Sequence, residues 1–172
     1  MKGHPGGEAH SLRMLALSGL EKGAKILDMG AGSGETVLLL QRLGYDAQGI
    51  DLEPGSDTVI QGDFLNTGYE DGSFDAVLSQ CAFFAGGNIP AALRESHRIL
   101  KHGGLLLLSD VCFMPEDMLR QLVESLGFSV LHQEDMTALW REYYIDALWA
   151  GTADCVPCGK KCTYQLLIGR KE

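Results

Sequence analysis

The spacing of hydrophobic positions alternates along this chain between that of helices and that of strands. Apolar residues recur every three or four positions, as on one face of a helix, in five segments: 8–19, 36–43, 90–100, 116–126 and 137–150. Between them lie short apolar runs of strand length: 24–29, 47–52, 58–63, 74–79, 105–110, 128–132 and 163–169. This alternation predicts an α/β fold built on a sheet of mostly parallel strands.

Residues 1–172 are expected to form one domain, with a cysteine-bearing loop at 151–163 before the last strand. The connection between the second and third strands departs from the pattern. Parallel neighbours normally need a crossover of about a dozen residues or more, and only a handful are present here. Either an extended loop replaces the crossover helix, or the third strand lies elsewhere.

The composition and charge of the chain limit the kinds of partner that it can have. The net charge of −9 would repel a phosphate backbone, so we expect a small-molecule partner and no nucleic acid. No stretch approaches eighteen apolar residues, and residues 1–7 lack the apolar core of a signal peptide. A cytoplasmic location and no membrane partner are therefore expected.

A glycine-rich turn follows the first predicted strand. The run 25–34 places an acidic residue, Asp28, before three alternating glycines and the start of a helix. Glycines let the backbone pass close to a ligand, and a helix N-terminus offers free N–H groups. A dinucleotide-binding fingerprint would need glycine at position 35, where this chain has Glu35. The spacing is instead Asp-x-Gly-x-Gly-x-Gly, which disfavours a nicotinamide cofactor.

This turn and four later motifs, 49–52, 61–64, 71–77 and 94–104, resemble those of the class I S-adenosylmethionine (SAM)-dependent methyltransferases. The resemblance covers about residues 10–135. It is strongest to the ubiquinone/menaquinone-methyltransferase-like branch, the type 11 methyltransferase domain. It implies a Rossmann-like three-layer sandwich with a mostly parallel seven-stranded sheet whose last strand is antiparallel. It also implies SAM as cofactor and methyl transfer as the activity.

The resemblance also implies roles for individual residues. Asp28 and Gly30 would hold the methionine end of SAM, Asp51 the ribose hydroxyls, and Asp63 the adenine amino group with Phe64 beside the ring. A carboxylate about twenty residues after the turn also suits ribose on physical grounds. The expected cofactor-binding set is Asp28, Gly30, Ala31, Gly32, Gly34, Asp51, Leu52, Gly62, Asp63, Phe64 and Ser79.

Two cysteines are the candidate catalytic residues. Ligands of such folds bind outside the carboxyl ends of the strands, and Cys81 and Cys112 follow the fourth and fifth strands there. A thiolate or other soft acceptor needs little help with proton removal, which favours a soft or thiol-linked acceptor. The alternative, that both cysteines are small buried hydrophobic residues, stays open.

Three further thiols, Cys155, Cys158 and Cys162, form a Cys-x-x-Cys-x-x-x-Cys run. Such thiols bind soft metals or exchange disulfides, although a structural zinc site needs a fourth ligand. The run supports an alternative function as a non-catalytic SAM- or metal-binding protein. Near the start of the chain, His4 either belongs to a lid over the cofactor or lies in a frayed terminus.

Overall fold

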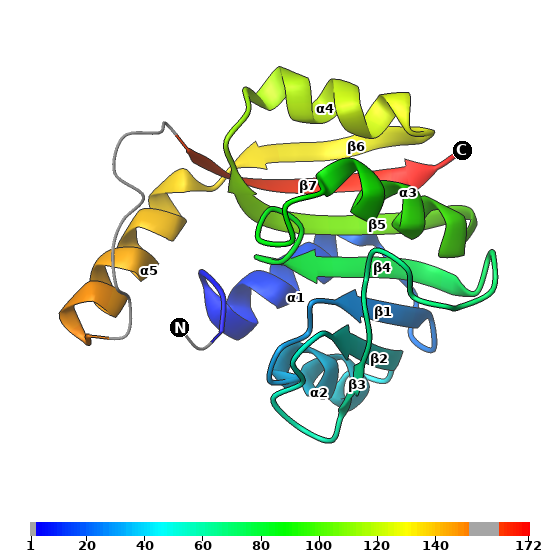
Figure 1. The fold of residues 1–172 in the computed structure, drawn as a ribbon, viewed down its shortest axis with the longest axis horizontal. Helices are drawn as coiled ribbons and strands as arrows, with labels where there is room; N and C mark the ends of the chain where they lie inside the picture. Colours follow the sequence, from blue (N-terminus) through cyan, green and yellow to red (C-terminus); the bar gives the residue numbers. More distant parts are fainter. Residues whose placement is uncertain (1–2, 152–161) are drawn as a thin grey trace.

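The strands form one seven-stranded sheet in the computed structural model, which describes residues 3–151 and 162–172 (Figure 1). Its spatial order is β3-β2-β1-β4-β5-β7-β6. The strands are β1 (Lys25–Met29), β2 (Asp46–Asp51), β3 (Val59–Gln61), β4 (Phe74–Gln80), β5 (Leu100–Cys112), β6 (Phe128–Asp135) and β7 (Thr163–Lys171). Neighbours from β3 to β5 pair in parallel, and β7 pairs antiparallel with both β5 and β6. The predicted mostly parallel sheet with an antiparallel last strand is confirmed.

Helices cover both faces of this sheet. They are α1 (Gly7–Ser18), α2 (Glu35–Arg42), α3 (Ile89–Ile99), α4 (Glu116–Ser125) and α5 (Thr137–Trp149). Alternate residues of a strand point to opposite faces, so the sheet carries two hydrophobic cores. Ile26 packs with α1 and α2 on one face, whereas Leu27 packs with α3 and α4 on the other. This is the predicted three-layer sandwich.

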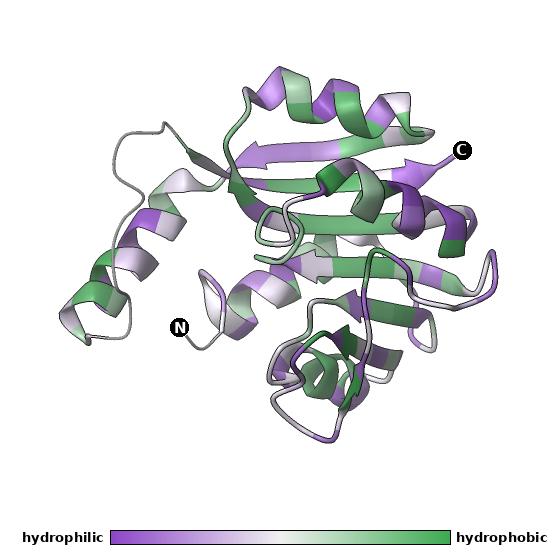
Figure 2. Cartoon of the chain, in the orientation of Figure 1, coloured by the Kyte–Doolittle hydropathy of each residue, from purple (hydrophilic) through white to green (hydrophobic). Residues whose placement is uncertain are grey.

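The hydropathy of the chain follows this layering (Figure 2). The central strands β4 and β5 are mainly hydrophobic, whereas the helices alternate hydrophobic and hydrophilic positions. Helix α5 differs from the other helices, because it extends beyond the end of the sheet (Figure 1). Among the helices of the described residues, none is long and apolar enough to cross a membrane.

The short connection between β2 and β3 is an extended loop. β3 pairs in parallel with β2 over only three residues, so the placement of the third strand is correct. The loop packs back on the glycine-rich turn: the N–H of Gly55 donates to the carbonyl of Gly32 at 2.8 Å, and the hydroxyl of Ser56 donates to the carbonyl of Ser33 at 2.8 Å. The loop therefore occupies the position of a crossover helix and supports the turn.

Strand β5 begins earlier than the sequence predicts. The glycines at 103 and 104 indicate a break before residue 105, but the strand already begins at Leu100. Its pairing with β4 shifts between Phe74 and Ala76, and Gly103 has a φ of +75°. The predicted break is thus an irregularity within a longer strand.

Candidate functional site

A pocket of about 490 Å³ lies at the carboxyl ends of β1 and β4, on the glycine-rich turn. This volume falls in the range of about 300–1,000 Å³ typical of small-molecule sites. The pocket is lined by Gly3, His4, Asp28, Gly30, Ala31, Gly32, Ser33, Glu35, Thr36, Glu53, Gly55, Gln80 and Cys81. We call it the turn pocket. Four residues of the sequence-derived cofactor set, Asp28, Gly30, Ala31 and Gly32, meet in it.

The turn itself requires glycine. Gly30, Gly32 and Gly34 have φ values of +83°, +51° and +81°, which side chains rarely adopt. A Cβ at Gly30 would lie 2.2 Å from the Cβ of Ala82, and one at Gly34 would lie 2.5 Å from the Oγ1 of Thr58. A Cβ at Gly32 would meet nothing within 4 Å, so the backbone there borders open space. A ligand can therefore approach the turn closely at Gly32.

Two carboxylates set the electrostatics beside the turn. Asp51, at the end of β2, accepts from the N–H of Gly32 at 2.8 Å and from the N–H of Glu53 at 2.9 Å. Asp28 is buried, and its burial and the charge of Asp51 raise its pKa to about 7. Negative charge thus collects where β1 and β2 end.

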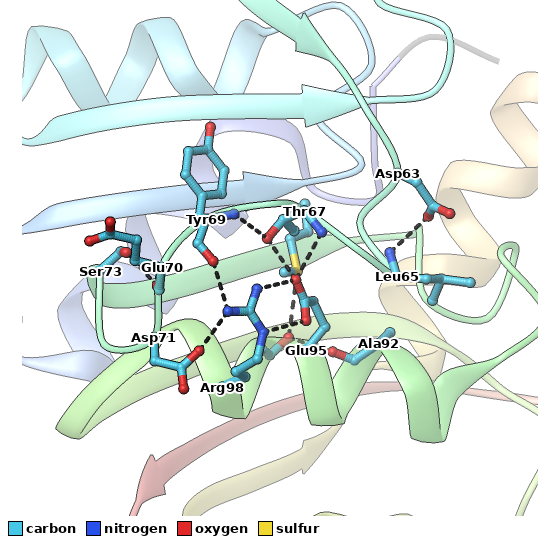
Figure 3. A network of polar contacts seen from close by, with 12 residues as sticks. Asp63, Leu65, Thr67, Tyr69, Glu70, Asp71, Ser73, Ala92, Glu95 and Arg98 are labelled. Carbon is cyan, nitrogen blue, oxygen red and sulfur yellow. Dashed lines mark hydrogen bonds and ion pairs between the residues drawn. The ribbon is translucent and has the colours of Figure 1, made fainter.

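The rest of the predicted cofactor set lies outside this lining. Leu52 and Asp63 are exposed, and the Asp63 carboxylate accepts from the N–H of Leu65 at 2.8 Å (Figure 3). Phe64 is buried in the core, with its ring centroid 5.5 Å from that of Phe83. Three more residues of the set are tightly packed. Gly34 packs against the β2–β3 loop and Gly62 against Ile50, and the hydroxyl of Ser79 donates to the Met29 carbonyl.

An ion-pair network fixes the segment that follows β3 (Figure 3). The Glu95 carboxylate accepts from the backbone N–H and the hydroxyl of Thr67, at 2.8 and 2.7 Å. The Arg98 guanidinium beside Glu95 also donates to Asp71 and to the Tyr69 carbonyl. Despite partial burial, these bonds lower the pKa of Glu95 to about 2. The network ties the segment carrying Asp63 to α3.

Several pocket residues were not predicted as site residues. Gln80, the last residue of β4, accepts from the hydroxyls of Ser11 and Thr36, each at 3.2 Å. Its amide nitrogen lies 3.3 Å from Nδ1 of His4, whose Nε2 lies 3.2 Å from the Ser11 hydroxyl. Burial lowers the pKa of His4, which leaves its ring neutral at pH 7. His4 is thus part of the pocket wall, as in the lid interpretation. Ser11, Thr36 and Gln80 come from three distant segments, and no local motif marks them.

The candidate catalytic cysteines are protonated thiols. Cys81 lines the turn pocket with a left-handed φ of +58°, and its Sγ lies 3.6 Å from the Tyr164 hydroxyl. Burial raises its pKa to about 12. Cys112 is buried in the core, donates to the Met114 carbonyl and also has a raised pKa. Neither thiol is ionised at neutral pH, which argues against a nucleophilic role.

The cysteine run near the end of the chain falls largely outside the described residues. Cys155 and Cys158 lie outside them, whereas Cys162 is described and is a half-buried free thiol. Across residues 3–151 and 162–172, no three His, Cys, Asp or Glu side chains are grouped as a metal site would need.

A second pocket of about 640 Å³ adjoins the first, between α1, α2 and α5. It is lined by Gly3, His4, Gly6, Gly7, Glu8, Ser11, Glu35, Thr36, Leu38, Leu39, Arg42, Leu139, Glu142, Tyr143 and Asp146. We call it the helix pocket. Tyr143 of α5 donates to the Gly3 carbonyl at 3.2 Å and so links α5 to the N-terminal segment. The two pockets share a wall formed by Gly3, His4, Glu35 and Thr36.

Comparisons with known proteins agree with this geometry. A family model described as a methyltransferase domain matches residues 27–108. An uncharacterised methyltransferase of Bacillus subtilis, YodH, is 28% identical over 148 residues, covering 76% of this chain and 63% of that protein. A demethylmenaquinone methyltransferase of Staphylococcus epidermidis is 31% identical over 113 residues, covering 55% and 46%. The chain thus spans less than two thirds of the length of these relatives.

A solved structure has the same fold over nearly the whole chain. Phosphoethanolamine N-methyltransferase 2 of Haemonchus contortus, solved with phosphomonomethylethanolamine and S-adenosylhomocysteine (SAH), superposes with a TM-score of 0.79. The match covers 98% of this chain and 53% of that one at 17% sequence identity. At that identity the match establishes the fold.

Proposed function

We infer that the chain belongs to the class I SAM-dependent methyltransferase family, and from this premise we propose that it transfers the methyl group of SAM to a small-molecule acceptor. The observation that carries the proposal is the turn pocket, built on the Asp-x-Gly-x-Gly-x-Gly turn inside the matched residues 27–108. The named activities of the relatives, on demethylmenaquinone and phosphoethanolamine, support an acceptor that is a small molecule and not a macromolecule.

We assign SAM to the turn pocket. Its open backbone at Gly32 and the nearby carboxylates of Asp28 and Asp51 suit a ligand with a cationic end and a ribose. Leu52 and Asp63 lie exposed on the adenine side. The other residues of the cofactor set act through the backbone that they hold: Gly34, Gly62, Phe64 and Ser79.

When bound, SAM supplies a methyl group on a sulfonium: the acceptor's lone pair forms the new bond as the carbon–sulfur bond breaks, and that electron pair stays on sulfur to give SAH. Positioning accounts for much of the rate of such an in-line displacement. For an acceptor that must lose a proton, we propose the neutral His4 ring on the shared wall as the base.

The acceptor enters, in this proposal, through the helix pocket. That pocket shares a wall with the turn pocket and lies beside α5, which extends beyond the sheet (Figure 1). The sequence favours a soft or thiol-linked acceptor because of Cys81 and Cys112. Their raised pKa values leave no cysteine thiolate to assist, so a thiol acceptor would also depend on the neutral His4 ring to take its proton.

The test is a calorimetric titration of the reduced, metal-free protein with SAM, with NADH as the control ligand. We expect micromolar binding of SAM and no binding of NADH, because Glu35 replaces the third glycine of a dinucleotide site. SAH formation is then screened over amine, hydroxyl and thiol compounds. Absence of SAM binding would refute the proposal, and binding without turnover on any acceptor would favour a non-catalytic SAM-binding protein.

Replacement of Asp51 tests the assigned ribose contact. Asp51→Ala removes a charged acceptor beside the turn, so the dissociation constant for SAM should rise about tenfold. The matched control is Asp57→Ala, which removes an exposed carboxylate of the nearby β2–β3 loop and should change that constant less than twofold. Equal affinity of Asp51→Ala and wild type would show that the ribose binds elsewhere.

A further inference from the structure

Glu35 occupies a position that links the two pockets. It is the first residue of α2 and lies on the wall shared by the turn pocket and the helix pocket. We propose that its carboxylate faces the sulfonium of SAM and makes the protein bind SAM more tightly than SAH. This inference rests on the proposed function, because it places the cofactor in one pocket and the acceptor in the other.

The shared wall marks where the methyl group crosses. A methyl group that passes from a ligand in one pocket to a ligand in the other must do so where the pockets meet. Of the four shared residues, Gly3 and Thr36 carry no charge, and the lowered pKa of His4 leaves its ring neutral. Glu35 is therefore the charged group of the crossing point.

The helix geometry makes this charge more significant. The N-terminus of a helix carries partial positive charge, which repels a cation such as a sulfonium. A carboxylate in the first turn counters this partial positive charge, and Glu35 is the acidic residue of the first turn of α2. The neighbouring pocket residues Gln80 and Cys81 are neutral, since the raised pKa of the thiol keeps it protonated.

The charge of the ligand changes in the reaction. SAM carries one positive charge more than SAH, on the sulfonium. A carboxylate that faces the sulfonium therefore binds SAM more tightly than SAH, by about fivefold for an exposed ion pair. Because this attraction fades as the methyl group leaves, it does not accelerate the chemical step. It favours capture of SAM and release of SAH instead.

Glu53 provides a matched control. It lines the turn pocket but not the helix pocket, and like Glu35 it is exposed. If any carboxylate near the cofactor gave the same preference, Glu35→Gln and Glu53→Gln would behave alike. If position on the shared wall decides the preference, the two variants differ.

The experiment measures dissociation constants by calorimetry for SAM, SAH and sinefungin, an analogue with a protonated amine in place of the sulfonium. For Glu35→Gln we expect SAM and sinefungin to bind about fivefold more weakly and SAH to change less than twofold. For Glu53→Gln the ratio of the SAM and SAH constants should stay within twofold of wild type. Melting temperatures confirm that both variants fold.

The other outcomes overturn the inference. Equal weakening of SAM and SAH by Glu35→Gln would mean that Glu35 contacts a part that both ligands share, such as the amino group. Unchanged constants for all three ligands would place the sulfonium elsewhere. In either case the proposed function stands, whereas a wild-type protein that binds neither SAM nor SAH refutes both.

Discussion

The two pockets differ in what builds their walls. The turn pocket is seated on a backbone turn: its lining residues Gly30 and Gly32 have positive φ, and the β2–β3 loop bonds to the carbonyls of Gly32 and Ser33. The helix pocket is formed mainly by side chains of α1, α2 and α5. A backbone-built site constrains which residues can occupy it, whereas a side-chain-built site can change its specificity by substitution. This division suits the proposed function, in which the turn pocket binds SAM and the helix pocket binds the acceptor.

The sharpest test of this difference is a single methyl group at Gly30. The Cβ of Gly30→Ala would lie 2.2 Å from the Cβ of Ala82, at a φ of +83°. Overpacking and strain each cost about 1–3 kcal/mol, so the variant should unfold more easily and bind SAM about a hundredfold or more weakly. Thermal melts and calorimetry measure both effects.

Gly68→Ala is the control for Gly30→Ala. Gly68 has a similar φ of +74°, but a Cβ there would meet nothing within 4 Å. It should lower the free energy of unfolding by about 1 kcal/mol and leave SAM binding unchanged. If both variants bound SAM like wild type, the backbone of the turn would not form the cofactor site.

The second test uses pH. Asp28 has a pKa of about 7 in the fold, against an ordinary value of 3.8, because it is buried and near Asp51. Its ionised fraction rises about tenfold between pH 6 and 8. If the carboxylate contacts the cationic end of SAM, affinity should rise about tenfold over that range, as calorimetry at each pH would measure.

The same group affects stability with the opposite sign. Between about pH 4 and 7 the folded protein holds a proton on Asp28 that the unfolded chain has lost, so the free energy of unfolding falls as pH rises. Asp28→Asn should flatten the pH dependence of both SAM affinity and the free energy of unfolding. Asp110 is the control: it is a buried carboxyl whose pKa is raised to about 6 by burial, and Asp110→Asn should leave the pH dependence of SAM affinity unchanged. A wild-type affinity that does not change with pH would contradict the role of Asp28.

The contrast between the pockets also explains what the sequence could predict. The strands, their parallel order and the turn follow from local signals: apolar runs, glycine spacing and the acid before the first glycine. The sequence shows Glu35 where a dinucleotide-binding fingerprint would have glycine, but it does not predict that Glu35 lies on a wall shared by two pockets. That wall needs residues 3 and 4 to meet α2, a long-range contact without a local pattern.

Placement relative to the sheet limited the other residue assignments. Phe64 and Ser79 belong to the expected cofactor set, yet both are buried, because residues at or just beyond strand ends can turn into the core as readily as into the pocket. The cysteines illustrate the same limit. Sequence spacing brings Cys81 and Cys112 to one edge of the sheet, whereas burial, which sets their pKa values, depends on the packing around them.

The smallest expected effect lies on the helix-pocket side. Tyr143→Phe removes the bond from the tyrosine hydroxyl to the Gly3 carbonyl, 3.2 Å long, which links α5 to the N-terminal segment. One neutral hydrogen bond contributes about 1 kcal/mol, so amide hydrogen exchange in residues 3–7 and α5 should quicken about fivefold. The dissociation constant for SAM should stay within twofold of wild type, because Tyr143 lines the helix pocket and not the turn pocket.

Tyr45→Phe is the matched control for Tyr143→Phe. The Tyr45 hydroxyl donates to the Leu20 carbonyl, also at 3.2 Å, but its contact lies away from both pockets. Loss of this hydrogen bond should speed amide hydrogen exchange only around residue 20. If Tyr143→Phe weakened SAM binding as much as Asp51→Ala, α5 would belong to the cofactor site. The cofactor site would then extend to a helix that lines only the helix pocket, and the division between the two pockets would fail.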